Sequence, residues 1–501
     1  MNTANLRSLF IIFGGTGDLT HRKLIPAIYN LHYEGRLPDQ FAVVGIGRRD
    51  KTPEEYLQDL YRAIKSFSRF PMDDTHWASL SKRIYYYQMD FTDASKYGEL
   101  KTFLDDLADR HNTLGNQIFY LAVAPEFFEP IVKNLKDSLL CHGKSFWQRV
   151  VIEKPFGRDL QSAIKLNATI VDAFGEENTY RIDHYLGKEM LQNLLVIRFA
   201  NLLFEPLWNR HYIEQIQLSS SETIGVEKRG PYYEQAGAIR DMVQSHMLQM
   251  LSLIAMEPPT SLTPEAIRDA KVTVLKQLKR MDRETVRKSV VRGQYGRSLD
   301  QQLLAYREED RVSPTSNTET YVAMRLEVEN DRWRGVPFYI RTGKRMPRKS
   351  TEVIIQFKDV HNNLYSHVPN LEPNLLVIRV QPQEGVFLQF NAKKPGNEDI
   401  IVPVQMDFCQ NCEIGINSPE AYERLLYDVM KGDQTLFARW DEVYESWKFI
   451  DTILDVWKEE EPDFPNYPAN TYGPKEADEL LARDGKKWLN IHEPWTALGG
   501  K

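Results

Sequence analysis

Apolar residues in the first third of the chain occur in short continuous runs, separated by stretches of helical spacing. Leu9 to Phe13 is the first run, and it suits a strand buried on both faces. Glycines follow it, and then Leu24, Ile28 and Leu31 recur at helical spacing. The further predicted strands are 41–46, 84–89, 117–123 and 149–152. Strands that alternate with helices predict a mainly parallel, doubly wound α/β domain of the Rossmann type.

The pattern changes after about residue 190, where strand-like segments follow one another with fewer helices between them. These segments are 213–219, 321–328, 338–341, 352–357, 375–380 and 385–390. They predict a large, mainly antiparallel or mixed sheet. The predicted helices of this half are 239–256, one or more within 264–292, 419–432 and 442–458. We therefore expect two domains, 1–190 and 191–501.

Charge and cysteine content narrow the class of protein. Lysine and arginine number 63 against 70 acids, a net charge of -7, so we expect no nucleic-acid partner. The apolar run near the N-terminus is too short for a signal peptide or a membrane span, and three cysteines in so long a chain point to the cytoplasm. Cys409 and Cys412 have the spacing of a metal site, but no second pair or nearby histidine completes four ligands, so we expect no metal.

The glycines after the first strand and the arginines after the second predict a coenzyme site. A turn at Gly14, Gly15 and Gly17 before a helix can receive a pyrophosphate, although Thr20 stands where G-x-G-x-x-G has its third glycine. A tight structural turn is the alternative. The second strand ends in Arg48 and Arg49, which favours the 2′-phosphate of NADP and leaves NAD possible.

The stretch from Arg181 to Lys188 combines a carboxylate, an imidazole, a phenol and an ammonium. If the chain is helical from Asp183 onward, His184 and Lys188 project from one face, next to Tyr185, and could bind a phosphate by charge-assisted hydrogen bonds. A buried polar network at a domain junction is the alternative.

Three more segments carry candidate chemistry. Lys154 precedes a proline at the end of a strand, the edge where ligands bind in such folds. His246 lies on an apolar helix five residues after Asp241, and a histidine oriented by a carboxylate is a competent general base. The cations of 341–349 could form part of an anion pocket. For each segment a purely structural role is the alternative.

These segments, in this order, resemble the glucose-6-phosphate 1-dehydrogenase family, bacterial type. The matching motifs include the glycine turn with Asp18 and Leu19, the peptide 153–157, the stretch 181–188, Arg240 to His246 and Arg341 to Lys344. The late helix around 421–426 matches as well. The resemblance runs from about residue 8 to beyond 475, and the stretch 181–188 is its most specific part.

The resemblance implies oxidation of C1 of β-D-glucose 6-phosphate to 6-phosphogluconolactone with transfer of hydride to NADP, the first oxidative step of the pentose phosphate pathway. His246 would be the general base and Asp183 its orienting carboxylate. The implied substrate-binding residues are Lys154, His184, Tyr185, Lys188, Glu222, Asp241, Lys344 and Lys349. The implied coenzyme-binding residues are Gly14, Gly15, Thr16, Gly17, Asp18, Leu19, Lys23, Arg48, Arg49 and Lys154. The resemblance also implies that 1–190 is the dinucleotide-binding domain and 191–501 the substrate-binding and oligomerisation domain, with a homodimer or homotetramer built on the outer face of the second sheet.

Two other functions stay open at this point. A sugar oxidoreductase of the inositol-dehydrogenase type shares the two-domain plan and a Glu-Lys-Pro peptide, but it lacks the stretch 181–188. A sensor of NADPH or sugar phosphate would have no use for a general base. The departures from the family, Thr20, His21 and Arg49, lie in the coenzyme region and bear on coenzyme preference.

Overall fold

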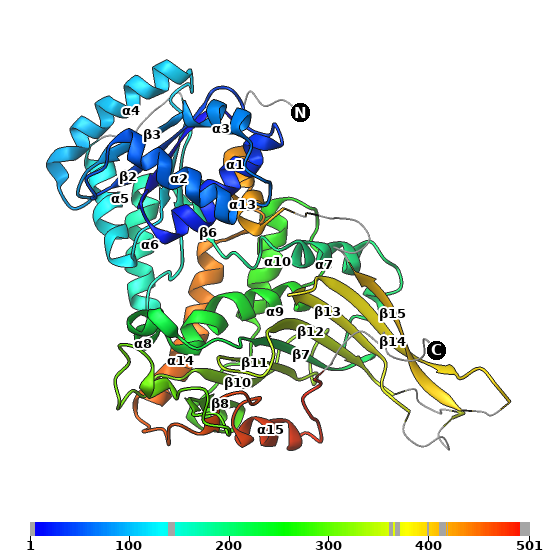
Figure 1. The fold of residues 1–501 in the computed structure, drawn as a ribbon. Coiled ribbons are helices and arrows are strands. Elements are labelled where there is room, and N and C mark those ends of the chain that lie inside the picture. The colour runs from blue at the N-terminus through cyan, green and yellow to red at the C-terminus, as the bar shows by residue number, and fades with distance from the viewer. Residues whose placement is uncertain are drawn as a thin grey trace. The chain divides into compact units, whose positions relative to one another are not determined.

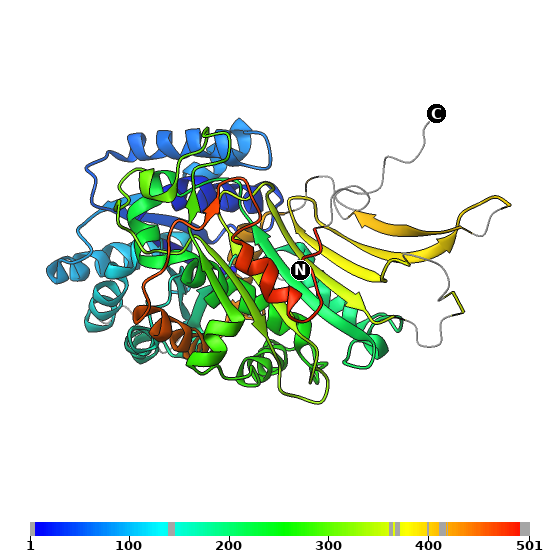
Figure 2. The ribbon, with the colours of Figure 1, turned by 90° about the horizontal axis from the view of Figure 1, so that it is seen from below.

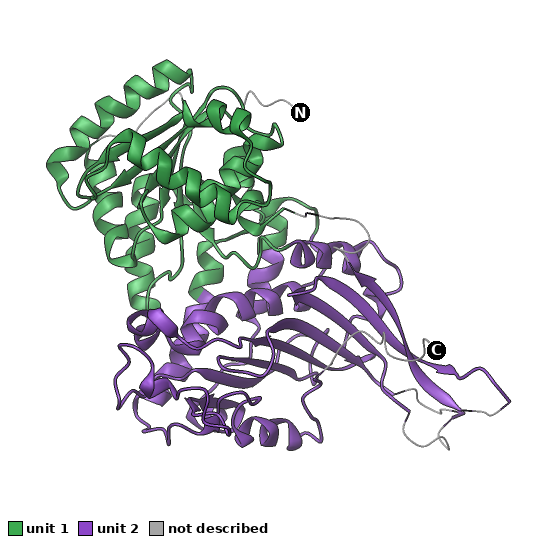
Figure 3. Ribbon diagram, in the orientation of Figure 1, with its two compact units in different colours: residues 1–188, 260–268, 419–444 green, residues 189–259, 269–418, 445–501 purple. Residues whose placement is uncertain are grey.

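The computed structural model describes residues 6–138, 146–359, 364–365, 371–397, 400–409, 417 and 419–490. The chain divides into two compact units (Figure 3). Unit 1 comprises residues 1–188, 260–268 and 419–444, and unit 2 comprises 189–259, 269–418 and 445–501. Two later segments therefore return to the unit that the N-terminus begins.

Unit 1 contains a seven-stranded sheet in the order β16-β6-β5-β4-β1-β2-β3. Its N-terminal segment is drawn in blue to cyan in Figure 1. The strands are β1 (Ser8–Phe13), β2 (Phe41–Gly47), β3 (Ile84–Gln88), β4 (Gln117–Leu121), β5 (Gln148–Ile152), β6 (Thr179–Ile182) and β16 (Phe437–Ala438). All neighbours pair in parallel except β16, which pairs antiparallel with β6. Every residue of β1, β2 and β4 is buried, as expected for a sheet covered on both faces.

The helices of unit 1 connect these strands. They are α1 (Ile25–Tyr33), preceded by the π-helical turn η2 (Thr20–Leu24), α2 (Pro53–Phe67), α3 (Asp74–Ser81), α4 (Tyr97–His111), α5 (Phe128–Asp137) and α6 (Leu160–Phe174). The returning segment adds α13 (Ala421–Lys431), which packs on α1. Buried Glu423 of α13 accepts hydrogen bonds from Asn30 of α1, at 3.0 Å, and from Nε and Nη2 of Arg69, at 3.1 and 2.6 Å.

Unit 2 contains an eight-stranded sheet in the order β15-β14-β13-β12-β7-β11-β10-β8. The strands are β7 (Ile213–Ser221), β8 (Val290–Gly293), β10 (Tyr321–Leu326), β11 (Phe338–Gly343), β12 (Ser350–Phe357), β13 (Leu375–Gln381), β14 (Gly385–Lys393) and β15 (Ile401–Cys409). Only the β7–β11 pair is parallel. The predicted α/β domain and mainly antiparallel second sheet are thus both confirmed.

The helices of unit 2 include α7 (Glu189–Phe199), η8 (Ile239–Met247), α9 (Leu248–Ala255), α11 (Arg283–Ser289) and α15 (Lys475–Ala482). Helix α15 lies on one face of the sheet, near β8 and β10 (Figure 2). Two helices cross from one unit to the other along the chain, α10 (Pro264–Lys276) and α14 (Trp440–Lys458). None of the described helices is long and apolar enough to span a membrane. Cys409 ends β15 and is disulfide-bonded, whereas Cys412 lies outside the described residues.

Candidate active site

The glycine turn of unit 1 is closed by contacts that exclude larger residues. Gly14 has φ +92°, and a Cβ there would lie 2.2 Å from the Ala122 carbonyl oxygen. A Cβ on Gly15 would lie 2.6 Å from the Cα of Gly45 in the neighbouring strand. The Thr20 hydroxyl, in the place of the third glycine, donates to the Gly14 carbonyl at 2.9 Å and so stabilises the turn from inside.

Not every N–H of this turn is available to a phosphate. The N–H groups of Gly14 and Gly15 both donate to the Ile46 carbonyl, and that of Gly17 donates to Gly14. The N–H groups that begin the following helix, around Asp18 and Leu19, have no intrahelical acceptor because they belong to its first turn. A pyrophosphate therefore fits at the helix start, where the dipole also favours it.

Arg48 and Arg49 follow β2 and are exposed, as a site for a 2′-phosphate requires. Arg48 lies with its guanidinium 5.5 Å from the centre of the Phe127 ring, and Arg49 donates to the Thr16 carbonyl at 3.4 Å. Lys23 is half exposed and pairs with Glu420 at 2.8 Å.

Lys154 follows β5 and Glu153, and the Lys154–Pro155 peptide is cis. The Glu153 carboxylate accepts hydrogen bonds from the hydroxyls of Tyr120, at 2.5 Å, and Tyr422, at 3.0 Å. Loss of solvent raises the pKa of Glu153, although the two hydroxyls and the Lys154 ammonium oppose this shift. Neither tyrosine contact was predicted from the sequence, because the three residues are far apart in the chain.

The stretch after β6 is a turn, so the conditional expectation of a helix from Asp183 onward is wrong. Asp183 accepts the N–H of Tyr185 on its carboxylate at 3.0 Å and that of Leu186 on its carbonyl at 3.0 Å. An aspartate that binds the backbone two residues on favours a turn over a helix. The Lys188 N–H then donates to Tyr185, and α7 begins at Glu189.

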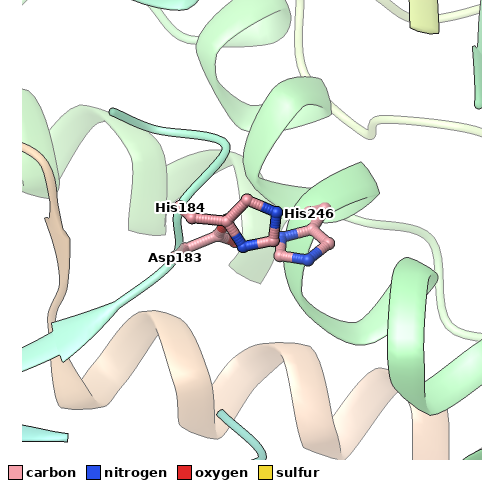
Figure 4. Close-up of side chains that lie close together, drawn as sticks. All are labelled: Asp183, His184 and His246. Atoms are coloured by element: carbon pink, nitrogen blue, oxygen red, sulfur yellow. The ribbon is translucent and has the colours of Figure 1, made fainter. Parts of the chain in front are cut away.

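The turn nevertheless holds three of the four side chains predicted for the sugar phosphate. The Lys188 ammonium lies 5.0 Å from the centre of the Tyr185 ring, and the rings of His184 and Tyr185 are 5.1 Å apart, edge to face. Asp183 and Tyr185 are buried, whereas His184 and Lys188 are partly exposed and accessible to an anion. Figure 4 shows Asp183 and His184 on this segment and His246 on its helix in the other unit.

His246 lies on a buried helix, as predicted, but the helix is not α-helical throughout. Residues 239–247 form the π-helix η8 and α9 continues it, so the helix predicted over 239–256 is confirmed as far as Ala255, with a first half that is π-helical. In a π-helix hydrogen bonds join residues five apart, the spacing of Asp241 and His246. Asp241 is 9% exposed and accepts the Tyr232 hydroxyl at 3.0 Å, and His246 is 1% exposed.

Glu222 and Lys344 meet at the ends of the two parallel strands of unit 2. Ser221 of β7 pairs with Gly343 of β11, so the next residue of each strand lies side by side. The Lys344 ammonium donates to Glu222 Oε2 at 2.5 Å and lies 5.0 Å from the centre of the Tyr233 ring. Lys349 is exposed, just before β12.

Glu319 and Thr320 connect the π-helix to the Lys344 turn, which the sequence did not suggest. The buried Glu319 carboxylate accepts the N–H of Ile239 at 3.0 Å, and its carbonyl accepts the N–H of Ala238 at 2.9 Å. The Thr320 carbonyl accepts the N–H of Lys344 at 3.0 Å. One short segment thus holds both the start of the histidine helix and the lysine turn.

Comparison with known proteins gives one consistent result. The family model described as "Glucose-6-phosphate dehydrogenase, NAD binding domain" matches residues 11–193, and "Glucose-6-phosphate dehydrogenase, C-terminal domain" matches residues 195–489. The chain is 49% identical to glucose-6-phosphate 1-dehydrogenase of Bacillus subtilis over 97% of this chain and 99% of that protein.

Solved structures agree with this result. A glucose-6-phosphate dehydrogenase in complex with its substrate glucose-6-phosphate is similar with a TM-score of 0.87 and 35% identity, over 97% of this chain and 99% of that one. The glucose-6-phosphate 1-dehydrogenase of Mycobacterium avium gives a TM-score of 0.81 and 35% identity, over 97% and 100% of the two chains. With models matching both halves, this chain belongs to the glucose-6-phosphate dehydrogenase family.

Proposed function

We propose that this chain oxidises glucose 6-phosphate at C1 with NADP, as a glucose-6-phosphate 1-dehydrogenase, and that His246 is its general base. The observation that carries the proposal is the match of family models to nearly the whole chain, from residue 11 to 193 and from 195 to 489. The described side chains are of the types that this reaction needs.

His246 takes the proton of the C1 hydroxyl, and Asp183 stabilises the imidazolium that forms and fixes the orientation of the ring. Burial of both side chains supports these roles, because a base shielded from water keeps one orientation and one partner. Proton abstraction by such a base contributes about 10²–10⁴-fold to the rate.

The phosphate of the substrate binds to His184, Tyr185 and Lys188, with Lys349 as a further cation. The close arrangement of the first three within one turn supports this role, since a dianion needs several donors at once. Glu222 and Asp241 accept hydrogen bonds from sugar hydroxyls, and Lys154 and Lys344 position the sugar. Energy from binding the phosphate, which does not react, then orients C1 toward the base.

NADP supplies the hydride acceptor when it is bound to unit 1. The helix start at Asp18 and Leu19 would hold its pyrophosphate against the turn of Gly14, Gly15 and Gly17. Thr16, Lys23, Arg48, Arg49 and Lys154 complete the coenzyme site, with Arg48 and Arg49 on the 2′-phosphate. Two exposed arginines at the end of β2 support a preference for NADP over NAD. We infer the division of roles expected from the sequence, with residues 1–190 for the coenzyme and 191–501 for substrate and subunit contacts.

The test is a comparison of initial rates with glucose 6-phosphate and glucose, each with NADP and NAD. We expect strong preference for glucose 6-phosphate, and a loss of about 10²-fold or more in kcat for His246→Ala with little change in KM. His211→Ala, which alters an exposed histidine of the same unit, is the matched control. Equal use of glucose would favour a sugar oxidoreductase, and an active His246→Ala would place the base elsewhere.

We also propose a homodimer or homotetramer in the cytoplasm. β14 and β15 support an interface on the second sheet, because most of their residues are only partly buried and Met406 is 64% exposed. Light scattering after size-exclusion chromatography would give the mass, and a monomer at micromolar concentration would contradict the proposal.

A further inference from the structure

Two tyrosines connect the glycine turn of unit 1 to the turn that carries Arg48 and Arg49, which we call the arginine turn. Tyr56 of α2 donates its hydroxyl hydrogen to the Gly15 carbonyl at 3.2 Å. Tyr86 of β3 donates its own to the Arg49 carbonyl at 2.6 Å. The two rings pack on each other, with centres 4.7 Å apart and planes tilted by 31°. We call Tyr56 and Tyr86 the tyrosine pair.

Glycines of β2 make room for this pair. A Cβ on Gly45 would lie 2.0 Å from the Tyr56 hydroxyl, and a Cβ on Gly47 would lie 2.9 Å from the Tyr86 hydroxyl. The two glycines are two residues apart, so they lie on the same face of the strand. The run Val44-Gly45-Ile46-Gly47 is therefore explained by packing as well as by coenzyme access.

The hydroxyls of the tyrosine pair can keep their hydrogen bonds at every pH in the neutral range. Burial raises the pKa of Tyr56, and loss of solvent also raises that of Tyr86. Both hydroxyls therefore stay protonated and keep donating throughout the neutral range. Tyr56 is 1% exposed, so its bond to Gly15 is shielded from competing water.

The turn that carries Arg48 and Arg49 needs such support because its side chains are long and exposed. An arginine side chain has many rotamers, and it loses part of this freedom when it is fixed on a ligand. If the backbone of the turn is already fixed, less conformational entropy is lost when a phosphate binds. β3 and the residue after it supply that fixation, through the Tyr86 hydroxyl and through the Met89 N–H, which donates to the Gly47 carbonyl at 3.0 Å.

We propose that the tyrosine pair positions the coenzyme site and that Tyr86 sets its selectivity. Tyr86 holds the arginine turn in place for a 2′-phosphate, whereas Tyr56 holds the glycine turn, which serves NADP and NAD alike. This inference rests on the proposed role of Arg48 and Arg49.

The test measures dissociation constants of NADP and NAD by calorimetry, without sugar phosphate, so that no turnover is needed. For Tyr86→Phe we expect NADP to bind about three- to tenfold more weakly, the value of one hydrogen bond, and NAD to change by less than about twofold. For Tyr56→Phe we expect the affinities for NADP and NAD to fall by a similar factor. Tyr87→Phe is the matched control: it lies on the opposite face of β3, where its ring packs on Phe103.

Two results would overturn the inference. One is an unchanged affinity of Tyr86→Phe for NADP, and the other is an equal loss for NADP and NAD. Arg49→Ala separates this failure from failure of the proposed coenzyme site. If Arg49→Ala weakens the binding of NADP alone but Tyr86→Phe does not, the inference about the tyrosine pair is wrong. If neither substitution changes the ratio of the two constants, the 2′-phosphate does not bind at this turn.

Discussion

The two units present their functional charges in different ways. In unit 1 the cations predicted to meet the coenzyme, Arg48 and Arg49, are exposed and follow a strand end. In unit 2 the predicted base and one predicted sugar-binding lysine are buried: His246 is 1% exposed and Lys344 is 7% exposed. Exposed cations can be replaced at little cost to folding, whereas buried ones depend on partners. Substitutions should therefore change coenzyme choice in unit 1, but stability and activity together in unit 2.

Glu423→Gln should give the largest effect, a loss of unfolding free energy. It is an exception to the contrast between the units, because unit 1 also has a buried charge. The substitution removes the buried one of the two carboxylates that pair with the Arg69 guanidinium, which is 7% exposed; Glu34, at 2.8 Å, remains. Loss of one partner of a buried pair costs about 3–5 kcal/mol, and the remaining Glu34 places the expected loss at the lower end of that range. Urea unfolding would measure it, with Glu129→Gln, an exposed partner of Lys165, as the control expected to lose less than about 1 kcal/mol. Equal losses would mean that burial does not govern these pairs.

Lys344→Met should lower kcat/KM by about 100-fold, or about 2.7 kcal/mol, because the ammonium beside Glu222 is lost from the sugar site. Stability should fall as well, since Glu222 loses its partner. Lys279→Met, which removes a half-exposed lysine paired with Glu327 in the same unit, is the control. Full activity of Lys344→Met would remove this lysine from the site.

Gly237→Ala should disturb the helix that carries Asp241 and His246. Gly237 has φ +63°, and a Cβ would lie 2.2 Å from Glu319 Oε1. Gly335 also has a positive φ, +85°, but open space around it, so Gly335→Ala reports the backbone strain alone. We expect Gly237→Ala to cost about 1–2 kcal/mol more than that control in thermal or urea unfolding, with a lower kcat. An equal cost would show that Glu319 can move aside.

Glu153→Gln should have the smallest effect of these substitutions, a change in how stability depends on pH. The pKa of Glu153 is raised above 4.5 in the folded protein, mainly by loss of solvent. The neutral carboxyl therefore favours the folded state below about pH 4.5, and this contribution is lost as the pH rises through the folded pKa. The stability of the wild type minus that of the variant should fall from pH 4.5 to 7. A constant difference would mean that the carboxyl titrates normally.

Local patterns predicted much of unit 1. The run 9–13, the glycines after it and the arginines after β2 are adjacent in sequence, so strand, turn and cations could be predicted together. β6 and β16 were not predicted, since they are short and defined by their partners. The turn at Asp183 was not predicted either, because a carboxylate that binds its own backbone leaves the apolar pattern unchanged.

The structure of unit 2 depends more on contacts between residues that are far apart in the chain, and the spacing of apolar residues does not predict such contacts. The Lys344–Glu222 pair joins residues 122 apart, and it follows from the parallel pairing of β7 with β11. The π-helical form of 239–247 has the same apolar spacing as an α-helix at this length, so the pattern could not distinguish them. β15 was not predicted because it contains Pro403 and is only partly buried.

The Glu319–Thr320 segment supports both the helix of His246, the proposed base, and the turn of Lys344, the proposed sugar-binding lysine. Because the start of η8 and the turn of Lys344 are hydrogen-bonded to adjacent residues just before β10, a displacement of this segment would move both together. The distance between them would then change less than the position of either one. In the proposed mechanism, the geometry at C1 would thus tolerate motion of the protein as long as this one junction stays intact.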